Sequence, residues 1–510
     1  MTLRRTLTPD TSATNVVARF VFDPIDKQAI QILVSAQAES GNHSDACKLL
    51  ARLVRLEPAS AIYIKNYAFC LQTLGRFSEA ANHYKRTIAL APDDASGWEG
   101  LGFTTPEHTI RAETGAPFFR AAAIQPYKSL GYSNLGAALL LMGRSAEAVV
   151  VGQQAIALNP GSNKAHTNLG NAFKALGNLN DAAVSYGRSL VVAADDPSTR
   201  WNNSMLLLLK GNLRDGFPMY EARLQLPSYR QARFPRWNGA DSVEGRKLLV
   251  RAEQGLGDTI QFCRFIDGLR DRNVFITVSV SRTLWPLLSP NLKDVVIDED
   301  SDALPRHDYE VSLMSLPAIL GIDQSHLPFR KNYLVTDPRR RERWLKVLPT
   351  ARLKVGIAWQ GKLNSVVDQG RSFSLDYFSR IASISGVQLI SLQKGNGTEQ
   401  VARCANRLNL YIPENGFDED GAFVDTAAIM MCLDLVITSD TAIAHLAGAL
   451  GVPVWVVLQQ TPEWRWMLNR NDSPWYPTMR LFRQSRSGSW DEPFTEITEA
   501  ISTLCRKGLA

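Results

Sequence analysis

Small, apolar and helix-ending residues recur every 34 residues through the first half of the chain. The series consists of prolines, turn glycines, and a small residue five positions after each glycine: Pro58, Pro92, Pro126 and Pro160; Gly41, Gly75, Gly143, Gly177 and Gly211; Ala46, Ala80, Ala148, Ala182 and Gly216. This period predicts helix–turn–helix units, in which the glycine forms the turn and the proline ends the second helix. Because one unit cannot bury its own apolar stripe, we expect about six helical pairs to stack into an α-solenoid over residues 25–225.

Two stretches of the first half depart from this pattern. The third unit carries Pro106 inside its expected first helix, and Thr109 stands where the turn glycine should be. A proline at that position predicts a kinked or broken helix. Residues 1–24 lack the pattern, and we expect them to form a flexible tail.

After a linker over residues 226–246, the pattern changes to short apolar runs that alternate with helical segments. The expected strands are residues 247–252, 274–280, 294–298 and 309–313, then 354–359, 387–392, 433–439 and 452–458. We expect the helix after the first run to begin at Thr259, and a closing helix near 491–507. Such alternation predicts parallel sheets covered on both faces. The predicted fold class is therefore α + α/β: an N-terminal α-solenoid followed by two Rossmann-like α/β domains, residues 247–345 and 346–510, with a cleft between them.

The composition excludes several classes of protein. The 510 residues are 45% hydrophobic and 21% charged with a net charge of +6, and no Lys/Arg run interleaves with aromatics, so nucleic-acid binding is not predicted. Six cysteines without CxxC spacing favour reduced thiols in a cytoplasmic protein. The apolar stretch 442–458 contains His445, Gly448, Gly451 and Pro453, which predicts a helix, a turn and a strand rather than an integral membrane segment.

The absence of complete nucleotide-binding and metal-binding motifs excludes further classes of protein. Gly255 and Gly257 begin a GxGxxG pattern, but its sixth position is Ile260, so a dehydrogenase is not predicted. No GxxxxGK[ST] sequence occurs, which removes P-loop kinases and ATPases. No His cluster or DxD pattern has the spacing of metal ligands, and we expect no metal.

The 34-residue repeat resembles the tetratricopeptide repeat (TPR) family, and one of its series resembles the repeats of O-linked N-acetylglucosamine transferases. Asn66, Asn134, Asn168 and Asn202 lie in register, with Gly100 at the missing position. The resemblance implies that these asparagines line an inner groove and bind the backbone of a protein acceptor. A side-chain amide suits that role because it offers one acceptor and two donors. The alternative is that the asparagines form hydrogen bonds between helices of the array.

Two motifs in the second half resemble the heptosyltransferase-related glycosyltransferases of the GT-B architecture, and their TPR-fused bacterial relatives still more closely. They are LLVRAEQGLGD (248–258) and ITSDTAIAHLAGALGVPVW (437–455). The resemblance implies an inverting, metal-independent transfer of a sugar from a nucleotide-sugar donor, without a cofactor. It also implies that Asp258 is the general base that acts on the acceptor.

The residue types in the first motif agree with that role. Sugar transfer needs a base for the acceptor proton and a cation or dipole for the leaving diphosphate. Asp258 follows a predicted strand, at the position where open parallel sheets bind ligands, and Gly255 and Gly257 allow a close approach of the backbone to a ligand. The alternative is that Asp258 caps the helix that begins at Thr259. Glu253 in the same loop is a second candidate base.

The second motif predicts a diphosphate site at a helix N-terminus, where backbone N–H groups and the helix dipole favour an anion. The hydroxyl of Thr441 can donate to a phosphate, and Ser439 precedes it in the same loop. Asp440 would repel phosphate, so we expect it to bind a sugar or ribose hydroxyl. His445 lies on the same helical face as Thr441 and is either a ligand contact or a structural residue.

Positive charge for the diphosphate is expected from loops after the strands. Lys362 follows Gly361, and the resemblance implies a phosphate-binding lysine near this point. Arg371 and Lys394 are further candidates. The aromatic residues of the segment after 458 could stack on a ligand, but we expect them to be core or interface anchors; they are Trp464, Trp466, Trp475 and Tyr476.

Together these features predict a nucleotide-sugar-dependent glycosyltransferase whose repeats bind a protein acceptor, for which the resemblance suggests bacterial flagellin. A transferase acting on a glycan or lipid-linked acceptor is one alternative. A non-catalytic TPR adaptor with a relic transferase domain is the other.

Overall fold

The computed structural model describes residues 23, 25–104, 115–298, 304–327, 332–362, 370–404, 407–413, 417–486 and 488–507. The chain forms two compact units, Met1–Leu176 and Gly177–Ala510, and each is described by itself. The kink expected at Pro106 and nearly all of the expected tail lie outside the described residues.

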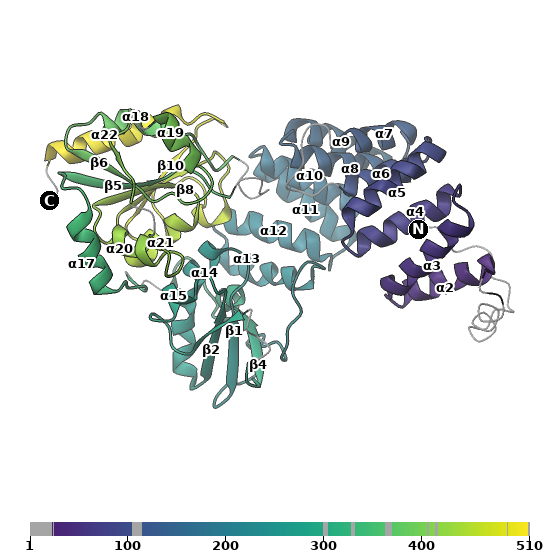
Figure 1. The fold of residues 1–510 in the computed structure, drawn as a ribbon, viewed down its shortest axis with the longest axis horizontal. Helices are drawn as coiled ribbons and strands as arrows, with labels where there is room; N and C mark the ends of the chain where they lie inside the picture. Colours follow the sequence, from purple (N-terminus) through teal and green to yellow (C-terminus); the bar gives the residue numbers. More distant parts are fainter. Residues whose placement is uncertain are drawn as a thin grey trace. The chain divides into compact units, whose positions relative to one another are not determined.

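The first unit consists of antiparallel helix pairs spaced by 34 residues (Figure 1). They are α2 (Lys27–Glu39) with α3 (His43–Leu56), α4 (Ala61–Thr73) with α5 (Phe77–Leu90), α6 (Ala95–Phe103) with α7 (Ala116–Ile124), α8 (Ser129–Leu141) with α9 (Ser145–Leu158), and α10 (Asn163–Ala175). The turn glycines Gly41, Gly75 and Gly143 have φ of +77°, +76° and +73°, while nothing lies within 4 Å of an added Cβ. Their backbone conformation, rather than crowding, therefore requires glycine. The predicted helix–turn–helix solenoid is confirmed.

The second unit begins with the last helices of the repeat. These are α11 (Leu179–Val192), α12 (Pro197–Leu209), α13 (Leu213–Tyr220) and the 3₁₀ helix η3 (Glu221–Gln225). The segment that follows is more than a spacer, because part of it pairs with the first sheet. Trp237 N–H donates to the Glu310 carbonyl at 2.8 Å, and Glu310 N–H donates to the Pro235 carbonyl at 2.9 Å.

The first sheet has four parallel strands in the order β3-β2-β1-β4. They are β1 (Lys247–Arg251), β2 (Phe275–Val280), β3 (Val295–Ile297) and β4 (Tyr309–Ser312). Its helices are α14 (Leu256–Phe262), η4 (Cys263–Arg272), α15 (Trp285–Leu288), η6 (Leu313–Ser315) and α16 (Leu316–Ile319), and α17 (Pro338–Val347) follows. The expected helix start at Thr259 is wrong. Gly255 is the N-cap of α14, so the helix begins three residues earlier, and Asp258 lies inside its first turn.

The second sheet has six parallel strands in the order β10-β9-β8-β5-β6-β7. They are β5 (Leu353–Ala358), β6 (Val387–Ser391), β7 (Leu410–Tyr411), β8 (Leu435–Ser439), β9 (Val454–Leu458) and β10 (Met479–Arg483). Its helical segments are η8 (Leu375–Phe378), α18 (Ser379–Ala382), η9 (Thr398–Gln400), α19 (Val401–Cys404), α20 (Val424–Met430), α21 (Ala442–Leu450), η10 (Trp464–Trp466) and α22 (Asp491–Lys507).

Both faces of the second sheet are buried, as predicted. Along β8, Leu435 and Ile437 join a core that includes Phe494 of α22, whereas Val436 joins a core that includes Ala444 of α21. This two-residue alternation reflects the opposite directions of successive side chains in a strand. In Figure 1, α18 and α22 lie on one side of this sheet and α20 and α21 on the other.

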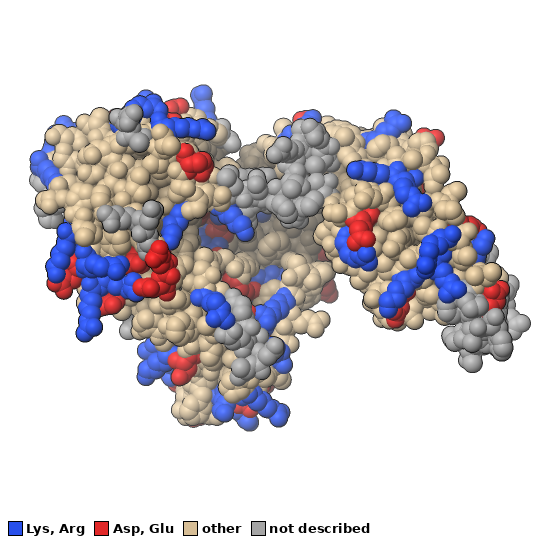
Figure 2. Space-filling view, in the orientation of Figure 1, with Lys and Arg blue, Asp and Glu red and all other residues tan. Residues whose placement is uncertain are grey.

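Within the described residues, the helices are short and the face in Figure 2 carries mixed charges. No helix in that part of the chain has both the length and the apolar character needed to span a membrane. On the face in Figure 2, Lys and Arg side chains lie among Asp and Glu side chains rather than in one continuous basic patch.

Candidate functional site

The second sheet has a topological switch point between β5 and β8. The chain proceeds from β5 to β6 and β7 on one side and from β8 to β9 and β10 on the other, so the loops after β5 and β8 part there. Open α/β sheets bind ligands at this position. Arg371 comes from the first of these loops and Asp440 from the second, and Arg371 Nε lies 3.4 Å from Asp440 Oδ2. The structure therefore brings together two of the predicted donor-site residues.

The loop after β8 leads directly into helix α21. Thr441 is its N-cap, and its hydroxyl lies 3.2 Å from that of Thr438 without capping the helix. Ser439 is fully buried, and its hydroxyl has no hydrogen-bond partner among the described residues. The first turn of α21 thus keeps backbone N–H groups and the half-buried Thr441 hydroxyl for a polar ligand, whereas the Ser439 hydroxyl is inaccessible.

The first sheet has the same kind of switch point between β1 and β4, but a side chain fills it. Glu253 follows β1 and Ser312 ends β4, and Arg223 from η3 reaches both. Arg223 Nη2 donates to Glu253 Oε1 at 2.5 Å, to Ser312 Oγ at 3.1 Å and to Ser315 Oγ at 2.9 Å. Burial alone would lower the pKa of this guanidinium, but the carboxylates of Glu253 and Glu221 raise it. Glu253, the second candidate base, is therefore held in a buried ion pair.

Asp258 lies in the first turn of α14 and accepts a hydrogen bond from the start of its own helix. Its Oδ2 accepts the N–H of Gly255, the N-cap residue, at 2.7 Å. The alternative that Asp258 is itself the N-cap of a helix beginning at Thr259 is therefore wrong, although its carboxylate does satisfy a backbone N–H at the start of α14. Its Oδ1 accepts a hydrogen bond from Arg465 Nη2. The Asp258 side chain remains 20% exposed, which leaves it accessible to a reacting group.

Arg465 joins the two sheets and was missed by the sequence analysis. It lies in η10, after β9 of the second sheet, and donates to Gln261 Oε1 of α14 at 2.6 Å, as well as to Glu463 and Asp258. Its guanidinium carbon is 4.4 Å from the ring centre of Trp464. Burial alone would lower the pKa of Arg465, but Glu463 and Asp258 raise it; burial raises the pKa of Glu463.

The first turns of α14 and α21 touch at Gly257. A Cβ added there would lie 2.8 Å from His445 Cδ2 and 3.3 Å from Ala442 Cα. The close packing of the two helices therefore requires glycine at this position, and a contact of Gly257 with a ligand stays a prediction. Because Asp258 follows Gly257 and Thr441 precedes Ala442, the two predicted functional residues belong to one region. At Gly255, a Cβ would instead lie 3.0 Å from Oδ2 of Asp258 in the same turn.

His445 lies inside the packed interface between the sheets. It is 5% exposed, its Nδ1 is 2.9 Å from the Tyr476 hydroxyl, and its ring stacks on Trp466 at 5.1 Å. Burial, followed by the charge of Arg465, lowers its pKa well below the usual value, so the ring is neutral near pH 7.

The four aromatic side chains expected to be core or interface anchors are all nearly inaccessible, which confirms that expectation: Trp464, Trp466, Trp475 and Tyr476.

The other predicted donor-site cations lie outside this cluster of contacts. Lys362 is exposed, and the N–H of the preceding Gly361 donates to Ser372 Oγ at 3.0 Å. Lys394 Nζ donates to the Phe417 carbonyl at 2.7 Å and lies 4.7 Å from its ring centre. Arg371 is thus the predicted cation that the structure brings to the β8–α21 loop.

Two of the register asparagines form hydrogen bonds between helices. Asn134 Nδ2 of α8 donates to Glu99 Oε1 of α6 at 3.2 Å. Asn168 Nδ2 of α10 donates to the Ser133 carbonyl and hydroxyl of α8, both at 3.0 Å. The alternative raised from the sequence is therefore confirmed for these two residues.

The remaining two asparagines of the register differ from this arrangement. Asn202 donates to the Ser198 carbonyl of its own helix at 3.0 Å. Asn66 is half-buried on α4. A role of the four asparagines in acceptor binding stays a prediction.

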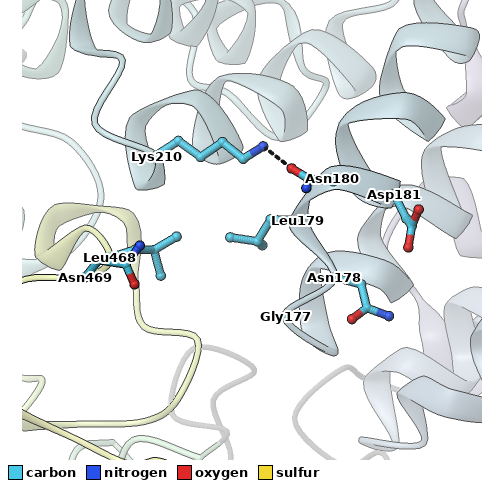
Figure 3. Close-up of a pocket in the computed structure, with 8 residues that line it drawn as sticks. All are labelled: Gly177, Asn178, Leu179, Asn180, Asp181, Lys210, Leu468 and Asn469. Atoms are coloured by element: carbon cyan, nitrogen blue, oxygen red, sulfur yellow. Dashed lines mark hydrogen bonds between the residues drawn. The ribbon is translucent and has the colours of Figure 1, made fainter.

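A polar cavity of about 560 Å³ lies in the second unit and was not predicted (Figure 3). It is lined by Gly177, Asn178, Leu179, Asn180, Asp181, Lys210, Leu468 and Asn469. Leu468 and Leu179 face each other across it, and Lys210 Nζ is 3.2 Å from Asn180 Oδ1. Two of the lining residues, Leu468 and Asn469, come shortly after η10 in the sequence, and η10 carries Arg465.

Comparisons with known proteins agree with the repeat. Residues 134–198 match the tetratricopeptide repeat family model, so the chain contains tetratricopeptide repeats. A stretch of 324 residues is 28% identical to Protein FlbA of Caulobacter vibrioides and covers 58% of this chain and 53% of FlbA. The chain thus spans about half the length of this curated relative.

Two solved structures are similar to part of the chain. A thermophilic TPR protein of Thermus thermophilus is 19% identical, with a TM-score of 0.32 over 36% of this chain and 99% of that protein. YrrB, a TPR protein with an unusual peptide-binding site, is 18% identical, with a TM-score of 0.27 over 34% of this chain and 91% of YrrB.

Proposed function

We propose that the chain is an inverting glycosyltransferase of GT-B type that moves a sugar from a nucleotide-sugar donor to a protein acceptor. The observation that carries the proposal is the contact between the first turns of α14 and α21, with Gly257 against Ala442 and His445. This contact puts a partly exposed carboxylate, Asp258, in the same region as a helix N-terminus that suits a diphosphate. The contact supports a site in which the first sheet supplies the base and the second sheet binds the donor.

The donor half of the proposal uses the switch point of the second sheet. The diphosphate binds the first-turn N–H groups of α21 and the Thr441 hydroxyl, where the helix dipole favours negative charge. Arg371 supplies a positive charge beside this turn, and Asp440 accepts a hydrogen bond from a sugar or ribose hydroxyl. Lys362 and Lys394 are further cations for the phosphates. No metal or cofactor takes part in this proposal.

The reaction itself is a single displacement at the anomeric carbon. The acceptor oxygen forms a bond to the face opposite the leaving group, the bond from carbon to diphosphate oxygen breaks, and the nucleotide leaves with its electron pair. The acceptor proton passes to Asp258. An ionised carboxylate has about four acceptor positions, of which Gly255 and Arg465 use two, so Asp258 retains capacity for a proton.

The acceptor half of the proposal uses the repeats. Stacked repeats present an extended concave surface, and repeats of this family suit protein partners. Asn66, Asn134, Asn168 and Asn202 are the proposed contacts to the acceptor backbone, and bacterial flagellin is the proposed acceptor. Asn134 and Asn168 would have to exchange their bonds to the neighbouring helix for bonds to the acceptor.

One observation favours the non-catalytic alternative. Arg223 closes the switch point of the first sheet, so a ligand position that open sheets commonly use is occupied by the protein itself. An adaptor would bind protein partners through its repeats and would have no affinity for nucleotides.

Nucleotide binding and turnover test the proposal directly. A bound nucleotide at a hundredfold excess over its Kd adds about 2.7 kcal/mol of stability, so UDP, GDP, ADP, dTDP and CMP can be compared by thermal unfolding. Asp258→Asn keeps an acceptor for the Gly255 N–H but removes the base. We expect it to lower donor turnover about 10²- to 10⁴-fold while the nucleotide-induced shift remains.

The matched control is Asp215→Asn in α13. Like Asp258, Asp215 is a carboxylate in the first turn of its helix. This substitution should leave turnover unchanged. No shift with any of the five nucleotides would favour the adaptor, and full turnover in Asp258→Asn would refute the assignment of the base.

A further inference from the structure

The loop that leads from β1 to Asp258 contains a backbone conformation that side chains rarely adopt. Gln254 has φ of +61°, in the left-handed region that favours glycine, and lies directly before Gly255. Such a conformation costs free energy and persists only where surrounding contacts impose it. The contacts around Gln254 therefore indicate what fixes this loop.

Those contacts come from the end of the helical repeat. Tyr220, the last residue of α13, accepts from Gln254 Nε2 at 2.9 Å, and its hydroxyl lies 3.3 Å from Gln254 Oε1. Tyr220 is 2% exposed, and burial raises its pKa to about 12, so its hydroxyl stays protonated. Three residues later, Arg223 binds the neighbouring Glu253 and lies 4.7 Å from the centre of the Tyr220 ring. Two consecutive loop residues are thus each held by the repeat.

The same loop sets the position of the candidate base. Gly255 follows Gln254, and its N–H donates to Asp258 Oδ2 at 2.7 Å. A rotation of the backbone at Gln254 would turn this N–H away from the carboxylate. The chain of contacts therefore runs from Tyr220 and Arg223, through Glu253 and Gln254, to the orientation of Asp258.

We propose that Tyr220 and Arg223, at the end of the repeat, are positioning residues that fix the Asp258 loop in its active geometry. This inference rests on the proposed transferase function. It makes the end of the repeat part of the catalytic framework, and it explains why Arg223 occupies the switch point of the first sheet. Neither residue is required to touch the donor.

Slow hydrolysis of the donor by the full-length protein provides a test that needs no acceptor. The probes are UDP-glucose, GDP-mannose, ADP-glucose, dTDP-glucose and CMP-N-acetylneuraminate, with release of the nucleotide as the signal. Tyr220→Phe removes the hydroxyl, and Gln254→Gly removes its partner while it adopts a positive φ without cost. Because a displacement of about 1 Å can lower a rate about a hundredfold, we expect both variants to lower kcat about ten- to a hundredfold, with the donor KM unchanged.

Thermal stability separates positioning from simple support of the fold. Gln254→Gly should keep or raise the Tm, since it relieves the strained backbone, yet it should lose activity. Asn273→Gly is the matched control, because Asn273 has φ of +49° at the end of η4 and lies outside this chain of contacts. It should keep both the Tm and kcat. Arg223→Lys should retain more activity than Arg223→Met, since it keeps the charge next to Glu253.

The outcomes distinguish this inference from the function on which it rests. Release of nucleotide by the unchanged protein, with kcat unaltered in Tyr220→Phe and Gln254→Gly, overturns the positioning role and leaves the transferase standing. Activity that falls only in step with the fraction of folded protein also overturns it. No release from any of the five probes overturns the transferase, and the positioning role with it.

Discussion

At the scale of single residues, the site depends on a buried guanidinium shared by three acceptors. Arg465 is 7% exposed and binds Asp258, Glu463 and Gln261. Removing one partner of a buried ion pair leaves charges without compensation, which costs about 3–5 kcal/mol. We therefore expect Arg465→Met to lower the free energy of unfolding by about 3 kcal/mol, as measured by urea denaturation.

A double-mutant cycle separates the contribution of the Arg465–Glu463 ion pair from that of the packing lost with the Arg465 side chain. Arg465→Met combined with Glu463→Gln removes both charges, and part of the lost stability should return. If the double variant is as unstable as the sum of the two single variants, the pair contributes nothing and the prediction is wrong.

Glu463 gives the protein a dependence on pH that can be stated with its sign. Burial raises its pKa above the usual 4.5 in the folded state, so folding favours the protonated carboxyl. The stability that this group contributes is present below pH 4.5 and is lost as the pH rises through the raised value. We therefore expect the unfolding free energy of the wild type to fall relative to that of Glu463→Gln as the pH rises from 4.5 through the raised pKa. A difference that stays constant with pH would contradict the assignment.

The residues of the site divide by whether their partners are local. Ser439, Asp440, Thr441 and Asp258 could be predicted, because each stands where a predicted strand gives way to a helix. Arg465 could not, because its partner Asp258 is 207 positions away in the chain and no local pattern connects them. The helix start was misjudged for a related reason: the Gly255–Asp258 capping pair is hidden in a loop that reads as glycine-rich.

At the scale of elements, the contact between α14 and α21 decides whether the two halves of the site meet. Gly257→Ala would put a methyl group 2.8 Å from His445, which is fixed by Trp466 and Tyr476 and cannot retreat. We expect the helices to separate, at a cost of about 1–3 kcal/mol, and donor turnover to fall. Thermal unfolding and nucleotide release measure the two effects.

The repeat offers a matched control for that substitution. Gly187 lies within α11 and has nothing within 4 Å of an added Cβ. Gly187→Ala should therefore stabilise the protein by about 0.5–1 kcal/mol, as expected for alanine in a helix, without affecting turnover. Equal behaviour of the two variants would show that crowding at Gly257 is unimportant.

The strands show where pattern reasoning succeeds and where it ends. Eight predicted apolar runs coincide with β1 to β6, β8 and β9, because strands of parallel sheets read as nearly continuous hydrophobic segments. Two strands were missed. β7 has only two residues, and β10 places the charged residues Arg480 and Arg483 among its apolar ones. Edge strands of this kind lack the hydrophobic run that identifies a central strand.

At the scale of the whole molecule, the proposal assigns donor chemistry to the sheets and acceptor binding to the repeats. Donor hydrolysis and transfer to protein should therefore respond to different substitutions. The asparagine register allows this separation to be tested, because its four members have different structural duties.

The pair Asn134→Ala and Asn168→Ala removes hydrogen bonds between helices. Each such bond contributes about 1 kcal/mol, so we expect this pair to lower the Tm by several degrees. The pair Asn66→Ala and Asn202→Ala breaks no bond between neighbouring helices that the structure describes, and we expect the Tm to stay the same. If the amides bind the acceptor backbone, both pairs should raise the acceptor KM in transfer to purified flagellin, and neither should alter nucleotide release in its absence. The second pair is decisive: loss of transfer without loss of stability can come only from acceptor contact, whereas normal transfer by that pair would reduce the register to bonds that hold the repeat together.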